Sequence, residues 1–438
     1  MTNRRQFLHT AGAATVFQLA GSGPQLQAGG ANDQVGLGFI GSGIRGTQLL
    51  GDFKAIPGVR PVVVCDLYDG YLERAREQTD RQAETTKDYR AVLNRKDVDA
   101  VVIATPDHWH KRMVLDALAA GKHVYVEKPM TWSLEEGPVI IEAVKKGGRL
   151  LMVGSQGKTS TLTAKAKELV ASGAIGKVNM VRMANHRNDP QGAWVYPIPP
   201  DASEKTIDWD SFLGPARKRS FDPKIFFRWR CWWEFSGGVA TDLFVHLLTW
   251  LHEVMGVDGP SSVVSQGGLY RFRDGRNVPD VMNSIFDYPQ GFLADIYVNM
   301  ANGYQGRSTA IFGSEGTILQ DFNSLTLVQE TARPDVQSYG TLGWPKAMRE
   351  AYFASHGWTP EGRPAEPLPP SKKPEEVRVE RGPSHFELFI LSLRENKPSR
   401  ETAAEGHYAA GAAHLANLSY RRGRRMQWDL AGGKVSES

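Results

Sequence analysis

Two side chains that can exchange a proton stand four residues apart, at Asp242 and His246. They follow the pair Gly237-Gly238, which permits a sharp entry of the chain into a helix. Because residues i and i+4 share one face of a helix, the carboxylate and the imidazole would lie side by side. The imidazole can then accept a hydroxyl proton, while the carboxylate orients the ring or binds a neighbouring hydroxyl. A helix with a satisfied Asp–His pair is the structural alternative.

A lysine offers a second group for the same chemistry. Lys128 stands in Glu127-Lys128-Pro129, directly after the apolar strand pattern at 124–126, and the proline stiffens the turn. An ammonium group there can donate a hydrogen bond to a reacting oxygen or transfer a proton. The spacing does not decide whether Lys128 or His246 is the base, and the two can titrate as a coupled pair.

A glycine-rich turn points to a dinucleotide. The strand pattern at 35–40 runs into Gly41-Ser42-Gly43-Ile44-Arg45-Gly46, a G-x-G-x-x-G that opens a helix. Its glycines let the backbone approach a pyrophosphate, which the helix N-terminus attracts. A second strand at 62–65 ends at Asp66, where a carboxylate can accept both ribose hydroxyls of NAD and repel a 2′-phosphate. The cofactor contacts predicted from this pattern are Gly41, Ser42, Gly43, Ile44, Arg45 and Asp66.

Strand and helix patterns alternate through the first third of the chain. Further strands are expected at 98–104, 124–126 and 150–153, and helices at 71–80, 89–93, 113–120 and 134–146. This alternation predicts a doubly wound parallel sheet, in which ligands bind at the carboxyl ends of the strands. Two polar motifs follow strands there: Thr105-Pro106-Asp107-His108-Trp109-His110 and Glu127-Lys128-Pro129.

The order of these motifs resembles the Gfo/Idh/MocA oxidoreductases. The matching residues are Thr105-Pro106, His110, Gly121-Lys122-His123 and Glu127-Lys128-Pro129, with Asp242 and His246 later in the chain. The resemblance is close over 34–155 and looser to about 420. It implies an enzyme that oxidises or reduces a carbinol of a sugar, cyclitol or related small molecule with NAD or NADP. It also implies a Rossmann domain followed by an α/β domain with an open, mostly antiparallel sheet, which carries substrate contacts and often the contacts of a dimer or tetramer.

The same resemblance assigns site residues. It implies catalytic roles for Lys128, Asp242 and His246, of which Asp242 and His246 would also bind substrate. It adds cofactor contacts from Thr105, Pro106, His110, Glu127, Lys128, Trp229 and Arg230. His186, in a polar stretch after the strand pattern at 179–183, is a further candidate for binding substrate hydroxyls, with a plain surface loop as the alternative.

Other ligand classes have weaker support. Asp107, His108 and His110 are metal-ligand types, but they coincide with the motif at the cofactor edge, so no metal is predicted. The aromatic and basic run at 226–233 could stack on bases. A net charge of +4 over 438 residues gives no wider basic surface, so nucleic acid is not expected as a partner. No apolar run is long enough to cross a bilayer, and two cysteines allow at most one disulfide.

The N-terminus has the pattern of an export signal. Arg4-Arg5 and Phe7-Leu8 precede a mildly apolar run to Ala20, which resembles a twin-arginine leader. We therefore expect a signal at 1–30, a cofactor domain at 34–155, and a substrate domain at 156–430 with a loop-rich arm at about 331–380. Export to the periplasm or beyond would separate the protein from the soluble nicotinamide pool, so NAD should be tightly held and regenerated in place.

Two reactions satisfy that requirement. In one, the enzyme oxidises a sugar and reduces a second substrate, as an exported glucose–fructose oxidoreductase of the resembled family does. In the other, transient oxidation at sugar C3 permits elimination of the glycoside, water adds, and the hydride returns. Exported NAD-dependent glycosidases of that family usually lack the lysine of Glu-Lys-Pro. Lys128 therefore favours a dehydrogenase-type enzyme. A sensor protein that kept the fold is the non-enzymatic alternative.

Overall fold

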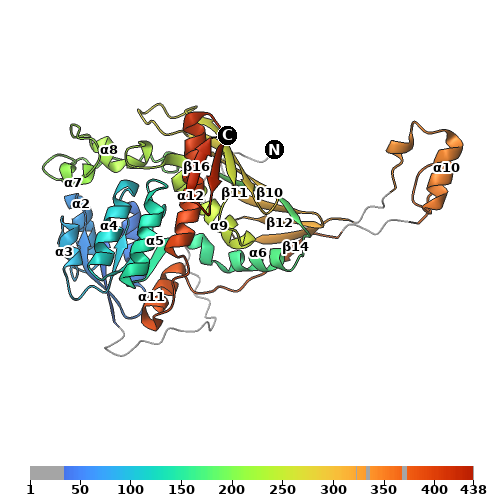
Figure 1. The fold of residues 1–438 in the computed structure, drawn as a ribbon. Helices are drawn as coiled ribbons and strands as arrows, with labels where there is room; N and C mark the ends of the chain where they lie inside the picture. Colours follow the sequence, from blue (N-terminus) through green and yellow to red (C-terminus); the bar gives the residue numbers. More distant parts are fainter. Residues whose placement is uncertain (1–33, 322, 332–335, 367–371, 438) are drawn as a thin grey trace, which may run out of the picture.

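The computed structural model describes residues 34–321, 323–331, 336–366 and 372–437. The predicted export signal at 1–30 lies outside these residues. Figure 1 shows two β-sheets side by side with helices against them, and a long helix, α12 (Ala403–Arg422), between the two halves.

The first sheet has six strands in the order β3-β2-β1-β4-β5-β6, all parallel. This order reverses between β1 and β4, where a crevice forms in folds of this class. The strands are buried along most of their length, as expected when helices cover both faces. They are β1 (Val35–Ile40), β2 (Val59–Cys65), β3 (Glu84–Thr86), β4 (Ala100–Ile103), β5 (His123–Glu127) and β6 (Leu151–Gly154).

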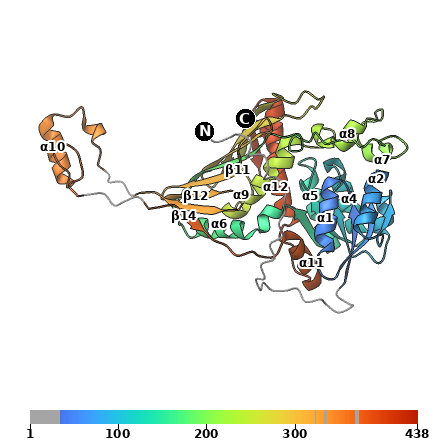
Figure 2. The same cartoon turned by 180° about the vertical axis from the view of Figure 1, so that it is seen from behind.

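The connecting helices are α1 (Ile44–Lys54), α2 (Asp69–Gln78), α3 (Tyr89–Leu93), α4 (Asp107–Ala119) and α5 (Glu136–Gly147). The helix expected at 113–120 begins six residues earlier, because Pro106 is its N-cap and Asp107 favours the first turn. Figure 2 shows α11 (His385–Glu395) beside α1, where Phe389 and Ile390 join the core of the first sheet. The C-terminal part of the chain thus returns to the cofactor half.

The second sheet has ten strands in the order β14-β13-β12-β11-β7-β10-β9-β8-β15-β16. Only β7 and β10 pair in parallel among these described strands. Both sheets confirm the predicted fold class. The strands are β7 (Val178–Arg187), β8 (Ser262–Gly268), β9 (Val281–Tyr288), β10 (Phe292–Asn299), β11 (Asn302–Gly313), β12 (Gly316–Gln320), β13 (Leu325–Gln329), β14 (Glu375–Val377), β15 (Met426–Asp429) and β16 (Lys434–Glu437).

One face of this sheet packs on α6 (Thr161–Ala171), α9 (Val245–Met255) and α12. Every second side chain of a strand points to this face. Val181 and Met183 of β7 do so, and they share a core with Leu247 and Leu251 of α9. The opposite face carries exposed apolar side chains, including Val264 and Ile285.

A segment at 196–230 leaves the second domain and lies against the first; it is called the strap here. It holds α7 (Trp209–Leu213) and α8 (Pro223–Phe227), and enters the short helix η3 (Trp229–Cys231). An antiparallel bridge joins Ile207 to Tyr68, just after β2. The Asp208 N–H donates to the Leu67 carbonyl at 2.9 Å, so the strap is fixed to the loop that carries Asp66.

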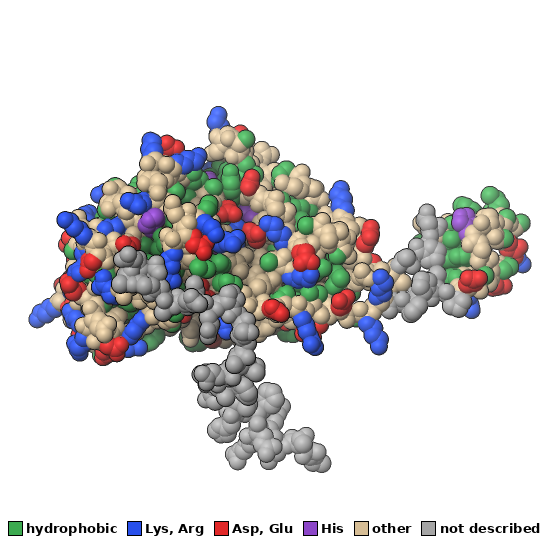
Figure 3. Space-filling view, turned by 90° about the horizontal axis from the view of Figure 1, so that it is seen from below, with side chains coloured by type: hydrophobic (Ala, Val, Ile, Leu, Met, Phe, Trp, Pro, Cys, Tyr) green, Lys and Arg blue, Asp and Glu red, His purple; other side chains and the backbone are tan. Residues whose placement is uncertain are grey.

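The expected loop-rich arm contains regular structure. The helix α10 (Lys346–Ser355) and the turn η5 (Tyr339–Thr341) stand apart from the body in Figure 1, and Figure 3 shows hydrophobic side chains gathered on this outlying part. The remaining short helices are η2 (Gln156–Thr159) and η4 (Ala240–Phe244). Both cysteines, Cys65 and Cys231, are free and buried, so the permitted disulfide does not form. Among the described residues, no helix is long and apolar enough to cross a membrane.

Candidate active site

A cavity of about 440 Å³ opens at the carboxyl ends of β1, β2 and β4. One side is formed by the glycine-rich turn and by Asp66 and Tyr71, and the other by the strap through Phe212, Phe227 and Trp229. The cavity therefore lies at the switch point of the strand order, where this class of fold binds dinucleotides.

The glycine-rich turn has the geometry that a pyrophosphate requires. Gly41 has φ of +91°, and a Cβ there would lie 2.6 Å from the Ala104 carbonyl oxygen. A Cβ on Gly46 would overlap the carbonyl oxygen of Gly41. The Ser42 N–H donates to Asp66 Oδ2 at 2.7 Å, which fixes the acid beside the turn. The glycines and the acid thus form the cradle that NAD fits.

The first turn of α4 fixes the strap over this cavity. The rings of His108 and Trp109 both approach the Phe212 carbonyl oxygen, each at 3.0 Å. Burial lowers the pKa of His108 to about 4, so its ring is neutral and donates one hydrogen bond. Of the three side chains weighed above as metal ligands, His108 holds the strap. Among the described residues no cluster suited to a metal ion occurs.

Gly214 makes this closure possible and permits a test of it. Its φ is +51°, and a Cβ there would overlap the ring of Trp109. We expect Gly214→Ala to destabilise the closed strap by about 1–3 kcal/mol, through backbone strain and steric overlap. The measurement is the fraction of bound nicotinamide that remains after gel filtration.

Gly148→Ala is the matched control for this change. Gly148 also has a positive φ, +57°, but a Cβ there meets nothing within 4 Å. If both variants keep as much nicotinamide as the parent protein, the strap does not retain the cofactor.

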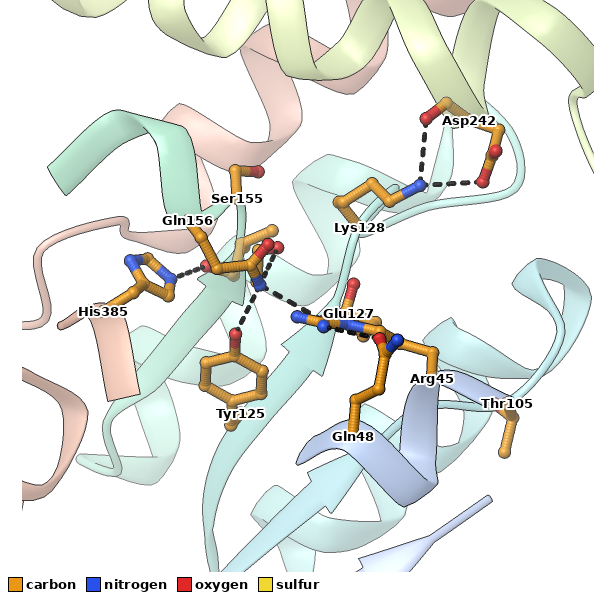
Figure 4. Close-up of polar contacts among 12 residues, drawn as sticks. Arg45, Gln48, Thr105, Tyr125, Glu127, Lys128, Ser155, Gln156, Asp242 and His385 are labelled. Atoms are coloured by element: carbon orange, nitrogen blue, oxygen red, sulfur yellow. Dashed lines mark hydrogen bonds and ion pairs between the residues drawn. The ribbon is translucent and has the colours of Figure 1, made fainter. Parts of the chain in front are cut away.

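The two domains meet in an ion pair at the carboxyl end of β5. Lys128 Nζ donates to Asp242 Oδ1 at 2.7 Å and to the Asp242 carbonyl oxygen at 2.9 Å (Figure 4). Arg230 Nε donates to the same Oδ1 at 3.2 Å, and Trp194 Nε1 donates to Oδ2 at 3.2 Å. Burial alone would raise the pKa of Asp242, but Lys128 and Arg230 hold it well below its usual range. Asp242 is thus a permanent carboxylate that positions both cations.

His246 lies on the same helical stretch as Asp242. Asp242 belongs to η4, a π-helical turn that runs directly into α9, and such turns are frequent at functional sites. Burial lowers the pKa of His246 well below 6.5, and the charges of Lys128 and Arg307 lower it further. Its imidazole is therefore neutral at pH 7 and partly exposed, as a proton acceptor must be.

Most predicted cofactor residues line the cavity. The group consists of Gly41, Gly43, Ile44, Arg45, Asp66, Thr105, Pro106, Trp229 and Arg230. Ser42 contributes through its hydrogen bonds to Asp66. Glu127 does not line the cavity; its Oε1 accepts from Arg45 at 2.8 Å and from Gln156 at 3.3 Å (Figure 4). Glu127 therefore orients Arg45.

His110 has a different place from the one predicted. It is 1% exposed and does not line the cavity. Its Nδ1 lies 2.7 Å from the Pro129 carbonyl oxygen, and its Nε2 lies 3.0 Å from that of Thr105. The ring therefore holds the loops after β4 and β5 together, and it positions Thr105 and Lys128.

His186, the predicted substrate residue, lies away from the cavity and from the Lys128–Asp242 pair. The expected loop at 185–187 is the end of β7, so side chains there alternate between the two faces of the sheet. His186 packs on Tyr297, and its Nδ1 accepts from the Asn299 N–H at 3.1 Å on the open face. Its neighbour Arg187 takes the face toward His246 and contributes to lowering the pKa of that ring.

Sequence reasoning missed several residues of the site. Trp194 lies 48 positions before Asp242, and no local pattern marks it as a partner. Asp107 was considered only as a metal ligand; it is 3% exposed and accepts from the Gly237 N–H at 3.4 Å. The strap was missed because its contacts with Tyr68 and His108 are distant in the sequence. A glycine followed by proline at 214–215 was the available signal of a turn.

Comparison with known proteins supports the assignment of both halves. Residues 35–155 match the oxidoreductase family with the NAD-binding Rossmann fold, and residues 216–319 match the Gfo/Idh/MocA C-terminal domain. Together the two matches cover just over half of the chain.

Similar sequences include a glycosyl hydrolase family 109 protein of Shewanella baltica, 32% identical over 170 residues. That match covers 33% of this chain and 37% of the relative. An α-N-acetylgalactosaminidase of Shewanella oneidensis is 37% identical over 120 residues, which cover 26% of each chain. This chain thus matches less than two fifths of the length of these curated relatives.

Similarity in fold to solved structures covers nearly the whole chain. A levoglucosan dehydrogenase in complex with NADH and levoglucosan has a TM-score of 0.63 at 18% identity. The alignment covers 92% of this chain and 99% of the other. With its two family matches and its glycine-rich cradle, the chain belongs to the Gfo/Idh/MocA family of oxidoreductases, and NAD is the cofactor of its first domain.

Proposed function

We propose that this protein is an NAD-dependent oxidoreductase that acts on a carbinol of a sugar or sugar derivative and keeps its nicotinamide between turnovers. The observation that carries the proposal is the Lys128–Asp242 ion pair of 2.7 Å, with His246 one turn further along. It fixes a hydrogen-bond donor and a neutral base together where the two domains meet.

The roles of the side chains follow from their hydrogen bonds. The ammonium of Lys128 gives two of its three N–H groups to Asp242, so the third remains for the reacting oxygen. His246 accepts the hydroxyl proton, since its imidazole is neutral at pH 7. Bound NAD supplies the hydride acceptor for the carbinol carbon. Asp242 positions Lys128 and takes no proton itself, because its pKa is far below its usual range.

The strap supports retention of the cofactor. It covers the cavity opposite the glycine-rich turn and is fixed by hydrogen bonds from the loop after β2 and from α4. A retained nicotinamide suits a protein exported by the twin-arginine route to the periplasm, and we propose that location from Arg4-Arg5. The reaction must then return the hydride to a second substrate or to the same one.

A second candidate is an NAD-dependent glycosidase that works by transient oxidation at C3, elimination, addition of water and re-reduction. The family 109 glycosyl hydrolases among the similar sequences favour it. Lys128, which such glycosidases usually lack, favours the dehydrogenase.

One experiment tests both candidates. The protein is purified without added nucleotide, and a denatured sample is assayed for released nicotinamide and its redox state. We expect about one nicotinamide per chain, because the strap encloses the cavity. Native protein is then mixed with free sugars, with reduction of the bound cofactor read near 340 nm.

A parallel sample receives p-nitrophenyl glycosides without added cofactor. Nitrophenol release would assign the glycosidase reaction, and reduction by free sugars without such release would assign the dehydrogenase. Protein without bound nicotinamide and with only weak affinity for it would contradict the proposal.

The open face of the second sheet leads us to propose a homo-oligomer, a dimer or a tetramer. Val264, Ile285 and Leu293 are exposed on the neighbouring strands β8, β9 and β10 of that face. Leu319 is exposed on the same face, on β12. Light scattering at several protein concentrations would determine its size.

A further inference from the structure

One residue at the Asp242 carboxylate has a backbone conformation that its own side chain disfavours. Trp194 has φ of +62°, in the left-handed region, where a bulky residue is a genuine outlier. Its side chain is buried, and its indole Nε1 donates to Asp242 Oδ2 at 3.2 Å. Such strain persists only where surrounding contacts hold it, and it is concentrated at functional sites. The contacts that hold Trp194 therefore bear on Asp242.

A buried arginine holds the peptide that precedes Trp194. Arg276 Nη2 donates to the Ala193 carbonyl oxygen at 2.8 Å. The same guanidinium donates through Nε and Nη2 to the two carboxylate oxygens of Asp274, each at 2.8 Å, and its side chain is fully buried. A planar fork held on both sides has one orientation. Because the carbonyl belongs to the peptide bond with Trp194, Arg276 fixes the turn that aims the indole at Asp242.

The loop that carries Arg276 also contacts η3, the helix of a second donor to the carboxylate. This loop, at 269–280 between β8 and β9, is called the brace here. The Asn277 N–H donates to the Cys231 carbonyl oxygen at 3.1 Å. Cys231 is the last residue of η3, and its neighbour Arg230 donates to Asp242 Oδ1. The brace thus holds two segments that supply donors to the same acid.

The brace packs on the entry to η4 as well, the turn that carries the acid itself. Gly238 lies two residues before η4, and a Cβ there would lie 2.9 Å from Val278 Cβ. Residues 276, 277 and 278 therefore contact the three segments that meet at the carboxylate. None of these three residues lines the NAD cavity, so their contacts concern the reacting centre and not the cradle of the cofactor.

We propose that the brace positions the proton-transfer site, with Arg276 keeping the indole of Trp194 on the Asp242 carboxylate. That carboxylate receives Lys128 and Arg230 at Oδ1 and the indole at Oδ2, so without the indole bond it can rotate. Rotation moves the ammonium of Lys128 away from the reacting oxygen. Arg276 acts through Trp194 and is a positioning residue. This inference rests on the proposed function, whose site it extends beyond the residues that touch substrate.

Trp194→Phe tests the indole bond. Phenylalanine keeps most of the ring and loses the N–H group that Asp242 accepts. We expect kcat to fall about 10-fold or more, because hydrogen bonds to charged groups are the strong ones. Nicotinamide content should stay at the parent level, since Trp194 does not line the cavity. The measurement is turnover per bound nicotinamide, followed near 340 nm. An unchanged kcat would overturn the inference.

Trp250→Phe is the matched control for the loss of indole volume. Trp250 is buried on α9, and its Nε1 has no hydrogen-bond partner within the described part of the chain. Its substitution should therefore leave kcat at the parent value. An equal fall of kcat in both variants would mean that ring volume, and not the bond to Asp242, governs turnover.

A double-mutant cycle tests whether Arg276 acts through Trp194. Arg276→Lys keeps the charge beside Asp274 and loses the planar fork, so kcat should fall several-fold. Added to Trp194→Phe, it should lower kcat no further, because the bond that it supports is already gone. Full additivity in kcat would overturn the role of Arg276. Turnover is again expressed per bound nicotinamide, so that a loss of folded protein does not enter.

Arg95→Lys is the control for the guanidinium fork. Arg95 holds Asp97 through the same two nitrogen atoms, each at 2.9 Å, in the first domain and away from the brace. We expect this variant to keep the parent kcat. A fall equal to that of Arg276→Lys would mean that the effect is not specific to the brace.

The indole N–H resonance of Trp194 separates a failure of this inference from a failure of the proposed function, because it needs no turnover. It is recorded on protein with isotope-labelled tryptophan and assigned by its absence in Trp194→Phe. We expect it to shift in Arg276→Lys and to stay in place in Arg95→Lys. If it shifts but no sugar reduces the bound nicotinamide, the brace stands and the proposed function is wrong. If sugars reduce the nicotinamide while Arg276→Lys changes neither the resonance nor kcat, the inference is wrong and the proposed function stands.

Discussion

Replacing His246 by asparagine is expected to lower kcat by about 10²–10⁴-fold, the usual range for loss of a general base. The bound nicotinamide should remain at the parent level, because His246 does not line the cavity that the strap closes. Nicotinamide content and single-turnover reduction near 340 nm, measured on the same preparation, separate the loss of chemistry from a loss of cofactor.

The lowered pKa of His246 also predicts how kcat depends on pH. Burial and then the charge of Lys128 lower the pKa of His246 below 6.5, so the imidazole stays neutral as the pH falls to 6.5. The acid limb of kcat should therefore lie below pH 6.5 and disappear in His246→Asn. A limb centred above pH 7 would contradict the assignment of His246 as a buried, neutral base.

His252→Asn is the control for the helix. His252 lies on α9 as well, but its Nε2 lies 2.9 Å from the hydroxyl oxygen of Tyr288, on the side of the sheet core. We expect this variant to lose thermal stability and to keep its turnover per folded molecule. If both variants lose turnover equally, the effect comes from the helix and not from the imidazole at 246.

The first domain could be predicted from the sequence because its signals are local. A strand, a glycine-rich turn and a helix follow one another within 34–54, and the acid that completes the site comes at the end of the next strand. The predicted parallel sheet, its order of alternation and the part of the cavity lining that comes from Gly41 to Arg45 and from Asp66 follow from such short patterns. The starts of helices were predicted less well. The helix expected at 113–120 is α4, which begins at Asp107, because Pro106 caps it.

The second half of the site depends on contacts between distant residues. The faces of β7 are set by its register with β10 and β11, which the sequence does not reveal. His186 was therefore named as a candidate for binding substrate hydroxyls, although its ring lies beside Tyr297 on the open face. The expected roles of Lys128, Asp242 and His246 came from a family resemblance. The structure adds the groups that orient the Asp242 carboxylate, which are the hydrogen-bond donors of Trp194 and Arg230.

Asp242→Asn is expected to destabilise the fold by about 3–5 kcal/mol, because removing one partner of a buried ion pair leaves the other charge uncompensated. The side chains of Lys128 and Asp242 are each only 11% exposed, and Arg230 also loses its partner in this variant. Denaturant unfolding of the parent and variant, followed by tryptophan fluorescence, measures the difference.

Asp80→Asn is a matched control for burial. The Lys54–Asp80 pair has the same length, 2.7 Å, but its side chains are 39% and 73% exposed. An exposed pair contributes about 0–1 kcal/mol, so this variant should unfold almost as the parent does. Equal effects of the two substitutions would mean that burial does not govern the Lys128–Asp242 pair.

The pH dependence of the Asp242 effect follows from linkage. Lys128 and Arg230 outweigh burial and hold the pKa of Asp242 below its unfolded value of about 3.9. Its contribution is therefore complete above pH 4 and declines only as the pH falls toward the folded pKa. The stability gap between parent and Asp242→Asn should be constant from pH 5 to 8 and narrow below pH 4. Since Asp242 positions the ammonium without exchanging a proton, turnover in this variant should fall across that whole range, with no new titration step.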